Sequence, residues 1–532
     1  MSPRILMVLA ALASVLAVPF LLKPRQNLLA KADDTLVIIS PHNEAVRHEF
    51  SMAFAKHYQL KTGRSIRIDW RLPGGTSEIS RFLAGEYLAA FEYAWTSQGK
   101  SWTPDIAAAF DNSKVKLPDD PAADTAAQAA RRSFLNSSTG IGIDLFFGGG
   151  AYDFEQQAKA GRLVASNVIK AHPAWFGQDT IPQSVSGEQF YDPRALWIGT
   201  CLSSFGVCYN TDSLHRLGVR GMPSSWKDLT NPVFYRQVAL ADPTKSGSAA
   251  RAFEMVIQQQ MQELVRKAGG PDEEMLALGW RRGLEIIQAA SANSRYFTDS
   301  SPKIPLDVSL GDAAIGMCID FYGRFQSEAV KISDAPSRLQ YFTPAGGSSV
   351  AVDPIGLLRG SPNRAAAEEF IAFVLSLEGQ KLWNFKVGVP GGPTKYALRR
   401  LPIRKELYLP EYAALRSDPD VQPYEEAKLF TYTAEWTAPV FRVMAFIIRV
   451  VCLDLHHEQA EAWQALVQAG FPREAYKKFT DLSAVDYATS KTSLKDALAS
   501  KDRIQEVRLA KELAEYFRRQ YREAAMLAKE GK

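Results

Sequence analysis

The chain has 532 residues, of which 46% are hydrophobic and 23% charged, a composition typical of a folded globular protein with about three domains. Its 62 basic and 58 acidic residues leave a formal net charge of only +4, so the sequence gives no indication of a nucleic-acid-binding surface.

The amino terminus carries a long apolar segment. After Arg4, residues 5–22 contain no charged side chain, which is typical of an export signal or a membrane anchor. The small residues of Ala30-Lys31-Ala32 fit a cleavage rule, but they lie far beyond the apolar run. We therefore expect residues 1–32 to remain on the protein as an anchor, with the rest of the chain outside the cytoplasm.

The first predicted strand leads directly into a helix. Residues 36–39 form a short apolar run, Pro41 suits the first position of a helix, and apolar residues then recur at helical spacing. In open α/β sheets ligands bind at such junctions, at the carboxyl ends of strands. His42, Asn43 and Glu44 are therefore candidate ligand-binding residues; the alternative is that they only cap the helix.

Two further junctions of this kind follow. Residues 66–72 alternate as a strand, and Gly74, Gly75 and Thr76 come next, where glycine allows close backbone approach to an anion. Residues 141–147 form a third strand, ending in three glycines that include Gly149. Three strand–helix units in sequence predict an α/β fold with a mainly parallel sheet.

The second half of the chain repeats the pattern. A strand at residues 237–241 leads through Thr244, Ser246, Gly247 and Ser248 into a helix, and this is the strongest candidate anion site in the sequence. An ordinary helix cap is the alternative. A strand at residues 313–319 ends at Asp320 and Tyr322, which are further candidates.

Eight segments carry a resemblance to a known family. They are SPHNEAVRHEF at 40–50, RLPGGTSEI at 71–79, SSFGVCYNTDSL at 203–214, WKDLTNPVF at 226–234, ADPTKSGSA at 241–249, IDFYGRF at 319–325, IGLLRGSPNRAAAEEFIAFVLSLEGQKLW at 355–383 and LPIRKEL at 401–407. On these segments the chain resembles the extracellular solute-binding proteins of bacterial ABC importers, which have the type II periplasmic-binding-protein fold. The ferric-iron-binding subgroup is the most similar.

The resemblance implies two α/β lobes joined by crossing strands, with a ligand held in the cleft between them. The family's iron binders use a His, a carboxylate and two neighbouring tyrosines. His42 and Tyr322 match two of these groups, but Phe321 replaces one tyrosine and Gly149 stands near the expected carboxylate. His42 and Tyr322, with Asp320 and a bound anion, could hold Fe(III) as the transported ligand. The same groups could equally hydrogen-bond a phosphorylated or carboxylated solute.

The resemblance also divides the chain into segments. We expect lobe 1 at residues 33–208 with an insertion near 88–140, lobe 2 at 209–318, a return segment at 319–424 and a helical extension at 425–532. Ile504, Val507, Ala510, Ala514, Phe517 and Tyr521 predict one apolar helix face in the extension, and the apolar run 441–453 is too short to span a membrane.

The cysteines allow a disulfide. The chain has Cys201, Cys208, Cys318 and Cys452, none at zinc-binding spacing. Because Cys208 and Cys318 lie on strands that resemble the family's crossings between lobes, they are the predicted pair.

These expectations define a non-enzymatic solute-binding component of an ABC importer. It would lie in the periplasm, attached to the membrane through its N-terminal segment, and would deliver Fe(III) or a small anion to an inner-membrane permease. An envelope sensor or scaffold with the same fold is the first alternative. An enzyme on this fold is the second, although the sequence contains no nucleophile elbow, HExxH motif or P-loop.

Overall fold

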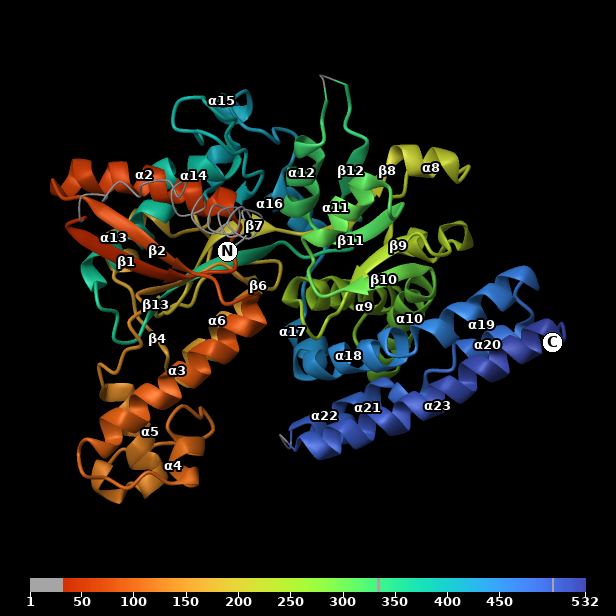
Figure 1. Ribbon diagram of the computed structural model, residues 1–532, viewed down its shortest axis with the longest axis horizontal. Helices are drawn as coiled ribbons and strands as arrows, with labels where there is room; N and C mark the ends of the chain where they lie inside the picture. The colour runs from red at the N-terminus through yellow and green to blue at the C-terminus, as the bar shows by residue number, and fades with distance from the viewer. Residues whose placement is uncertain (1–31, 333–334, 500–501) are drawn as a thin grey trace, which may run out of the picture.

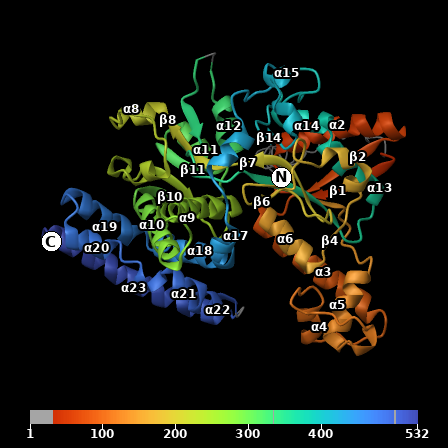
Figure 2. The ribbon, with the colours of Figure 1, turned by 180° about the vertical axis from the view of Figure 1, so that it is seen from behind.

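The computed structural model describes residues 32–332, 335–499 and 502–532. Two α/β lobes lie side by side, and a layer of C-terminal helices packs on the second (Figures 1 and 2). The strand order is β14-β7-β13-β3-β1-β2 in the first sheet, with β4 beside β13, and β10-β9-β11-β8-β12 in the second. The predicted two-lobed α/β fold with a helical extension is confirmed. The predicted membrane segment, residues 1–32, lies outside the described residues except for Ala32.

Lobe 1 is built on the first sheet. Its strands are β1 (Asp34–Ile39), β2 (Ile66–Arg71), β3 (Leu145–Phe147), β4 (Leu163–Val164), β7 (Ile198–Ser203), β13 (Ala351–Leu358) and β14 (Leu401–Pro402). Its helices are α2 (Glu44–Thr62), α6 (Ala151–Ala160), α7 (Val168–Ala171), α13 (Arg364–Leu375), α14 (Leu377–Asn384), α15 (Pro410–Ala413) and α16 (Pro423–Glu426). β1, β2 and β3 pair in parallel, whereas β13 runs antiparallel to β3, β4 and β7, and β14 runs antiparallel to β7. The sheet is therefore mixed, and the predicted mainly parallel sheet is wrong, because β13 returns to lobe 1 from lobe 2 in the opposite direction.

Two smaller elements extend from lobe 1. The helices α3 (Thr76–Thr96), α4 (Pro104–Ala109) and α5 (Ala126–Asn136) form an arm that projects away from the sheet (Figure 1). A short hairpin of β5 (Ser184–Val185) and β6 (Glu188–Gln189) precedes β7.

Lobe 2 is built on the second sheet. Its strands are β8 (Phe205–Asn210), β9 (Val238–Ala241), β10 (Ser294–Thr298), β11 (Ile315–Ile319) and β12 (Leu339–Phe342). Its helices are α8 (Thr211–Arg216), α9 (Gly247–Ala268), α10 (Glu273–Ala292), α11 (Lys303–Leu310) and α12 (Asp320–Ala329). β7 and β8 follow one another along the chain and are separated only by Ser204, so that one continuous run supplies a strand to each lobe.

The C-terminal extension shares its core with lobe 2. It comprises α17 (Ala434–Thr437), α18 (Phe441–Ile448), the π-helical turn Arg449–Leu453, α19 (His456–Gln468), α20 (Arg473–Phe479), α21 (Tyr487–Lys491), α22 (Ser493–Ala499) and α23 (Arg503–Lys529). Phe517 and Tyr521 of α23 belong to the same buried apolar cluster as Trp280 of α10. The Trp280 indole N–H also donates to the Val485 carbonyl oxygen at 3.1 Å.

One segment of the extension, Ala434–Leu453, is long and apolar enough to cross a membrane by length and composition. It is longer than the apolar run expected from the sequence. However, 61% of its apolar window is buried inside the protein, and Met444 and Ile448 are fully enclosed in the lobe 2 core. This segment is therefore a core element in the present fold.

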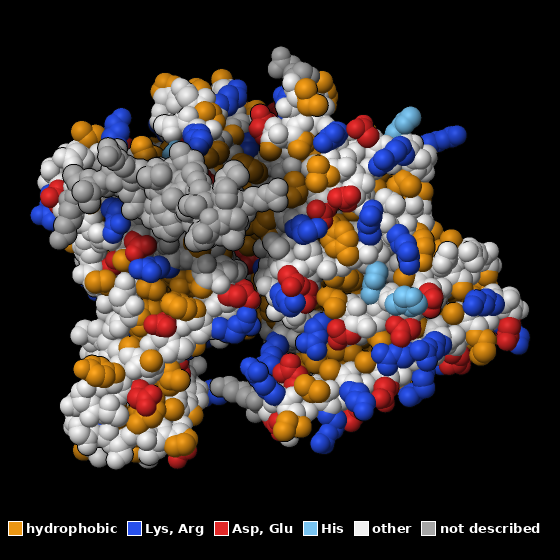
Figure 3. Space-filling model, in the orientation of Figure 1, with side chains coloured by type: hydrophobic (Ala, Val, Ile, Leu, Met, Phe, Trp, Pro, Cys, Tyr) orange, Lys and Arg blue, Asp and Glu red, His pale blue; other side chains and the backbone are white. Residues whose placement is uncertain are grey.

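The predicted apolar face of α23 is only partly buried. Phe517 and Tyr521 are fully buried, but Ile504, in the first turn of α23, is 72% exposed and Val507 is 69% exposed. Lys and Arg side chains gather along the outer side of the extension (Figure 3), as expected for its solvent face.

The predicted disulfide is wrong, since Cys208 and Cys318 are both buried free thiols. In the antiparallel pair β8–β11, Cys208 lies opposite Gly316 and Cys318 lies opposite Gly206. The two cysteines are thus diagonal neighbours, about 7–8 Å apart at Cα, which exceeds the reach of an unstrained disulfide.

Candidate functional site

His42 lies at the carboxyl end of β1 with its imidazole buried between lobe 1 side chains. Its ring packs edge-on against Phe147 at 4.6 Å and lies 6.0 Å from the ring of Trp383. Neither ring nitrogen has a hydrogen-bond partner in the described part of the chain. Burial, followed by the charges of Arg400 and Arg47, holds the pKa of His42 well below its usual value. The imidazole is therefore neutral and offers one N–H donor and one acceptor.

The helix begins later than the sequence predicted. Asn43 is the N-cap of α2 and accepts a hydrogen bond from the Val46 N–H at 3.1 Å, and Glu44 is the first helical residue and is exposed. Pro41 therefore precedes the helix. Asn43 acts as a cap, the alternative that the sequence left open, and only His42 of this trio is buried.

The glycines after β3 lie against the residues that follow β1 and β2. A Cβ added to Gly148 would lie 2.5 Å from His42 Nε2, and one added to Gly149 would lie 2.7 Å from Thr76 Cγ2. Both glycines have positive φ angles. His42, the glycine pair and Thr76 thus lie next to one another where β1, β3 and β2 end. Gly74 and Gly75 lie in the exposed loop before α3, where the Glu78 side chain contacts them.

Arg400, just before β14, is a site residue that the sequence analysis missed. Its Nη1 donates to the carboxylate of Asp353 on β13 and lies 3.5 Å from Cys201 Sγ. Burial is the largest influence and opposes the charge of Arg400, but Asp353, Cys201 and Tyr322 together raise the pKa of the guanidinium. Nε and Nη2 make no hydrogen bond within the described ranges.

Arg400 also contacts lobe 2. Its guanidinium lies 3.5 Å from the centroid of the ring of Phe321, the second residue of α12. Phe325, one turn further along α12, packs against the core of lobe 1. The two lobes are therefore in contact across the cleft, and Arg400 lies at that contact.

Asp320 and Tyr322 approach the same point from lobe 2. Asp320 is fully buried, and neither carboxylate oxygen has a hydrogen-bond partner in the described residues, although Arg324 Nη1 lies 3.2 Å away. Burial raises the pKa of Asp320 to about 6. Desolvation likewise raises the pKa of Tyr322. The positive charge of Arg400 lowers this pKa, and the negative charge of Asp353 raises it. These couplings put Tyr322 within electrostatic reach of Arg400.

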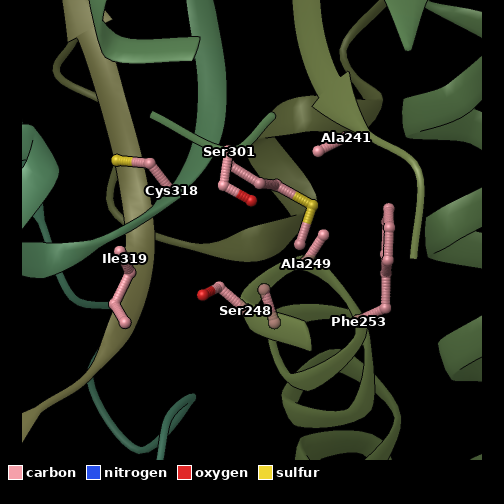
Figure 4. A pocket seen from close by; sticks show the side chains of 9 residues that line it. Ala241, Ser248, Ala249, Phe253, Ser301, Cys318 and Ile319 are labelled. Atoms are coloured by element: carbon pink, nitrogen blue, oxygen red, sulfur yellow. The ribbon is translucent and has the colours of Figure 1, made fainter. Parts of the chain in front are cut away.

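The start of α9 forms a second part of the lobe 2 surface. Ser246 is its N-cap and accepts from the Ala249 N–H, while the Thr244 hydroxyl donates to Asp242 at 2.6 Å. A Cβ added to Gly247 would meet open space. Ser248 and Ser301 point into a small cavity of about 10 Å³ (Figure 4), which has room for one water molecule.

This cavity lies between the start of α9 and the end of β11. Ile319, which directly precedes Asp320, lines it together with Cys318. Of the predicted residues, His42, Gly149 and Thr76 meet in lobe 1, Asp320 and Tyr322 meet near Arg400, and Ser246 and Ser248 lie beside the end of β11. Asn43, Glu44 and Thr244 have local or exposed positions.

Within residues 32–332, 335–499 and 502–532, no group of three or more His, Cys, Asp or Glu side chains is arranged to hold a metal ion. The positive charge of Arg400 acts on both His42 and Tyr322 and lowers the pKa of each.

The sequence identifies the family of the chain. The family model described as "Bacterial extracellular solute-binding protein" matches residues 143–418, just over half of the chain. The protein belongs to this family, as the resemblance in the sequence indicated.

Curated relatives match over part of their length. A protein of Haemophilus influenzae is 26% identical over 247 residues, 45% of this chain and 60% of that protein. The phosphoglycerate transport regulatory protein PgtC of Salmonella typhimurium is 22% identical over 207 residues, 38% of this chain and 43% of PgtC. The chain thus spans about half the length of these relatives.

Solved structures of periplasmic binding proteins are also similar. AfuA of Actinobacillus pleuropneumoniae, with fructose-6-phosphate bound, is 17% identical, with 80% of this chain and all of AfuA covered and a TM-score of 0.48. Iron-bound HitA of Pseudomonas aeruginosa is 16% identical, with 78% and 99% covered and a TM-score of 0.46.

Proposed function

We propose that the protein captures a small anionic solute between its lobes and delivers it to an ABC-type permease in the inner membrane. One observation carries this proposal: buried polar atoms without partners gather around Arg400. They include both ring nitrogens of His42 and the indole nitrogen of Trp383. The carboxylate oxygens of Asp320 also make no hydrogen bond in the described residues, although they form an ion pair with Arg324. Since buried polar groups are normally hydrogen-bonded, such a cluster favours a bound ligand that completes them.

The chemistry of these atoms favours an anion that also carries hydroxyl groups. Arg400 supplies a fixed positive charge in a planar fork suited to carboxylate or phosphate oxygens. His42 and Trp383 add neutral N–H donors, whereas ionised Asp320 is an acceptor suited to a solute hydroxyl. A hydroxylated phosphate ester or hydroxy acid meets both requirements.

The match to PgtC supports the same class of solute. Its name associates that relative with phosphoglycerate, a phosphorylated hydroxy acid. We therefore place phosphorylated and carboxylated solutes ahead of Fe(III), the other ligand expected from the sequence. The positive charge of Arg400 and the lack of a three-ligand group among the described residues argue against ferric ion.

A thermal-shift panel tests the proposal. The panel contains inorganic phosphate, 3-phosphoglycerate, fructose 6-phosphate, ferric citrate and spermidine. A ligand present at 100 times its dissociation constant should stabilise the folded protein by about 2.7 kcal/mol. We expect a phosphorylated compound to raise the melting temperature. A shift with ferric citrate or spermidine alone would contradict the proposal.

The location follows from the family and the N-terminal segment. We propose that the folded part lies in the periplasm and stays attached to the inner membrane through residues 1–32. Sequencing the amino terminus of the mature protein tests the attachment. A mature chain that begins at Asp33 would rule it out.

A further inference from the structure

In the part of the chain that the structure describes, the backbone crosses between the lobes three times. The first crossing is Ser204 between β7 and β8, and the second is residues 343–350 between β12 and β13. The third leads into the extension: Ala427 is buried in the lobe 1 core, and Phe430, three residues later, is buried in the lobe 2 core. A Cβ added to Gly346 would lie 3.1 Å from the Leu429 carbonyl oxygen, so the second and third crossings run side by side.

A buried charge cluster fixes the third crossing to both lobes. Arg251 of α9 pairs with Glu188 of β6 in lobe 1 and, through Nη1 at 2.6 Å, with Glu254 in lobe 2. Its guanidinium lies 4.4 Å from the centroid of the Tyr432 ring, and the Tyr432 hydroxyl donates to Glu254 at 3.1 Å. The Tyr432 N–H donates to the Ser186 carbonyl oxygen in lobe 1 at 2.8 Å.

The same segment is attached to lobe 2 by side chains of α9. Gln258 donates from Nε2 to the Thr433 carbonyl oxygen and to the Thr437 hydroxyl, both at 2.8 Å. Further along, Phe441 of α18 packs against Tyr152 of α6 in lobe 1, with ring centroids 5.4 Å apart. The segment therefore moves with lobe 2, while its contacts with lobe 1 must break if the lobes separate.

We propose that residues 427–441, the hinge strap, hold the two lobes in contact and limit how far the cleft opens. Opening would separate Glu188 from Arg251 and Tyr152 from Phe441. Separating a buried ion pair is costly, because each partner is left without its counter-charge in a poorly solvated environment. The strap thus acts at the hinge, independently of which solute the cleft takes.

Electron–electron distance measurements test the strap without any solute. Nitroxide labels are placed on cysteines introduced at Lys56 of α2 and His215 of α8, two exposed positions on opposite lobes. The test variant combines Tyr152→Ala with Glu188→Gln. We expect a second, longer distance population that the labelled wild-type protein lacks.

A matched control makes the same two types of substitution, tyrosine to alanine and glutamate to glutamine, within the extension. Tyr476→Ala removes a ring that lies 5.8 Å from Phe471, and Glu523→Gln removes the partner of Lys478 at 2.8 Å. Neither pair involves lobe 1, so the control should keep the wild-type distances. Equal lengthening in the control would overturn the proposal.

The single variant Tyr152→Ala keeps the test decisive if the double variant misfolds. Tyr152 is 44% exposed, so we expect this variant to fold. A smaller population at the longer distance is expected for this variant. A folded Tyr152→Ala protein with unchanged distances, or an unchanged folded double variant, would refute the strap.

Discussion

Asp320 provides a residue-scale test through pH. Its pKa is about 6 in the folded protein, against an ordinary value of 3.8, because burial disfavours the carboxylate. Folding favours the protonated form of Asp320. The contribution of this group to the free energy of unfolding is therefore largest below pH 4 and is lost as the pH rises through 6. One pKa unit corresponds to about 1.4 kcal/mol, so the loss amounts to about 3 kcal/mol.

The variant Asp320→Asn should remove this dependence. We expect its free energy of unfolding, measured by urea denaturation at pH 4.5 and pH 8, to change less with pH than that of the wild-type protein. The amide mimics the protonated carboxyl group and cannot ionise. An identical difference between the two pH values in both proteins would show that Asp320 is not the titrating group.

A second residue-scale prediction concerns iron. We expect the protein to stay colourless after addition of ferric citrate, because Arg400 opposes a cation beside His42 and Tyr322. The measurement is the visible absorption spectrum of the protein after removal of unbound iron. A charge-transfer band that disappears in Tyr322→Phe would establish the ferric site instead.

Sequence reasoning at this scale was limited by distance along the chain. His42 and Asp320 could be predicted as candidates because each follows an apolar strand, where ligands of α/β sheets bind. Arg400 could not, since β14 has only two residues and no pattern marks it. Its partners Asp353 and Phe321 are 47 and 79 positions away, so only the folded structure shows the cluster.

The extension gives a prediction at the scale of elements. Trp280 of α10 is fully buried where lobe 2 meets the extension, and its indole N–H bonds to Val485. Trp280→Ala should destabilise the protein by about 3–5 kcal/mol through lost burial and the cavity that remains. Chemical denaturation measures this change.

Ile504→Ala is the matched control, since Ile504 is 72% exposed on the first turn of α23. We expect it to change stability by less than about 0.5 kcal/mol. A loss at Trp280 no larger than this would mean that the extension does not share the core of lobe 2.

The spacing of apolar residues predicted helices and strands better than it predicted which elements they pack against. The apolar spacing in residues 504–521 correctly indicated a helix, but it could not show that Ile504 and Val507 lie in solvent. In the same way, the switch between sheets at Ser204 depends on contacts with distant strands, which no local pattern marks.

At the scale of the whole molecule, the main apolar core of each lobe predicts one cooperative unit. One apolar cluster fills lobe 1, another is shared by lobe 2 and the extension, and a smaller third cluster lies within lobe 2. Trp280→Ala should therefore speed amide hydrogen exchange in both α10 and α23, while α13 of lobe 1 keeps its protection. Faster exchange in α10 with unchanged α23 would contradict a shared core.

The two-lobed architecture followed from the resemblance, whereas the hinge strap did not. The contacts of the strap join β6, α9 and the segment 427–441, which are distant in sequence and carry no common motif. For residues 425–532 the sequence predicted helices but no contact between the lobes.

The most direct test of the account is a calorimetric titration with the phosphorylated compound that gives the largest thermal shift in the panel. Arg400→Lys keeps the positive charge but loses the planar fork, and it should weaken binding by about 10- to 150-fold, the equivalent of a charged hydrogen bond worth about 1.5–3 kcal/mol. Arg404→Lys is the control, because Arg404 is also buried but its partners are Glu406 and the Leu375 carbonyl oxygen. This variant should bind the compound as the wild-type protein does. Unchanged affinity in a folded Arg400→Lys protein would show that the cleft does not hold its solute through Arg400.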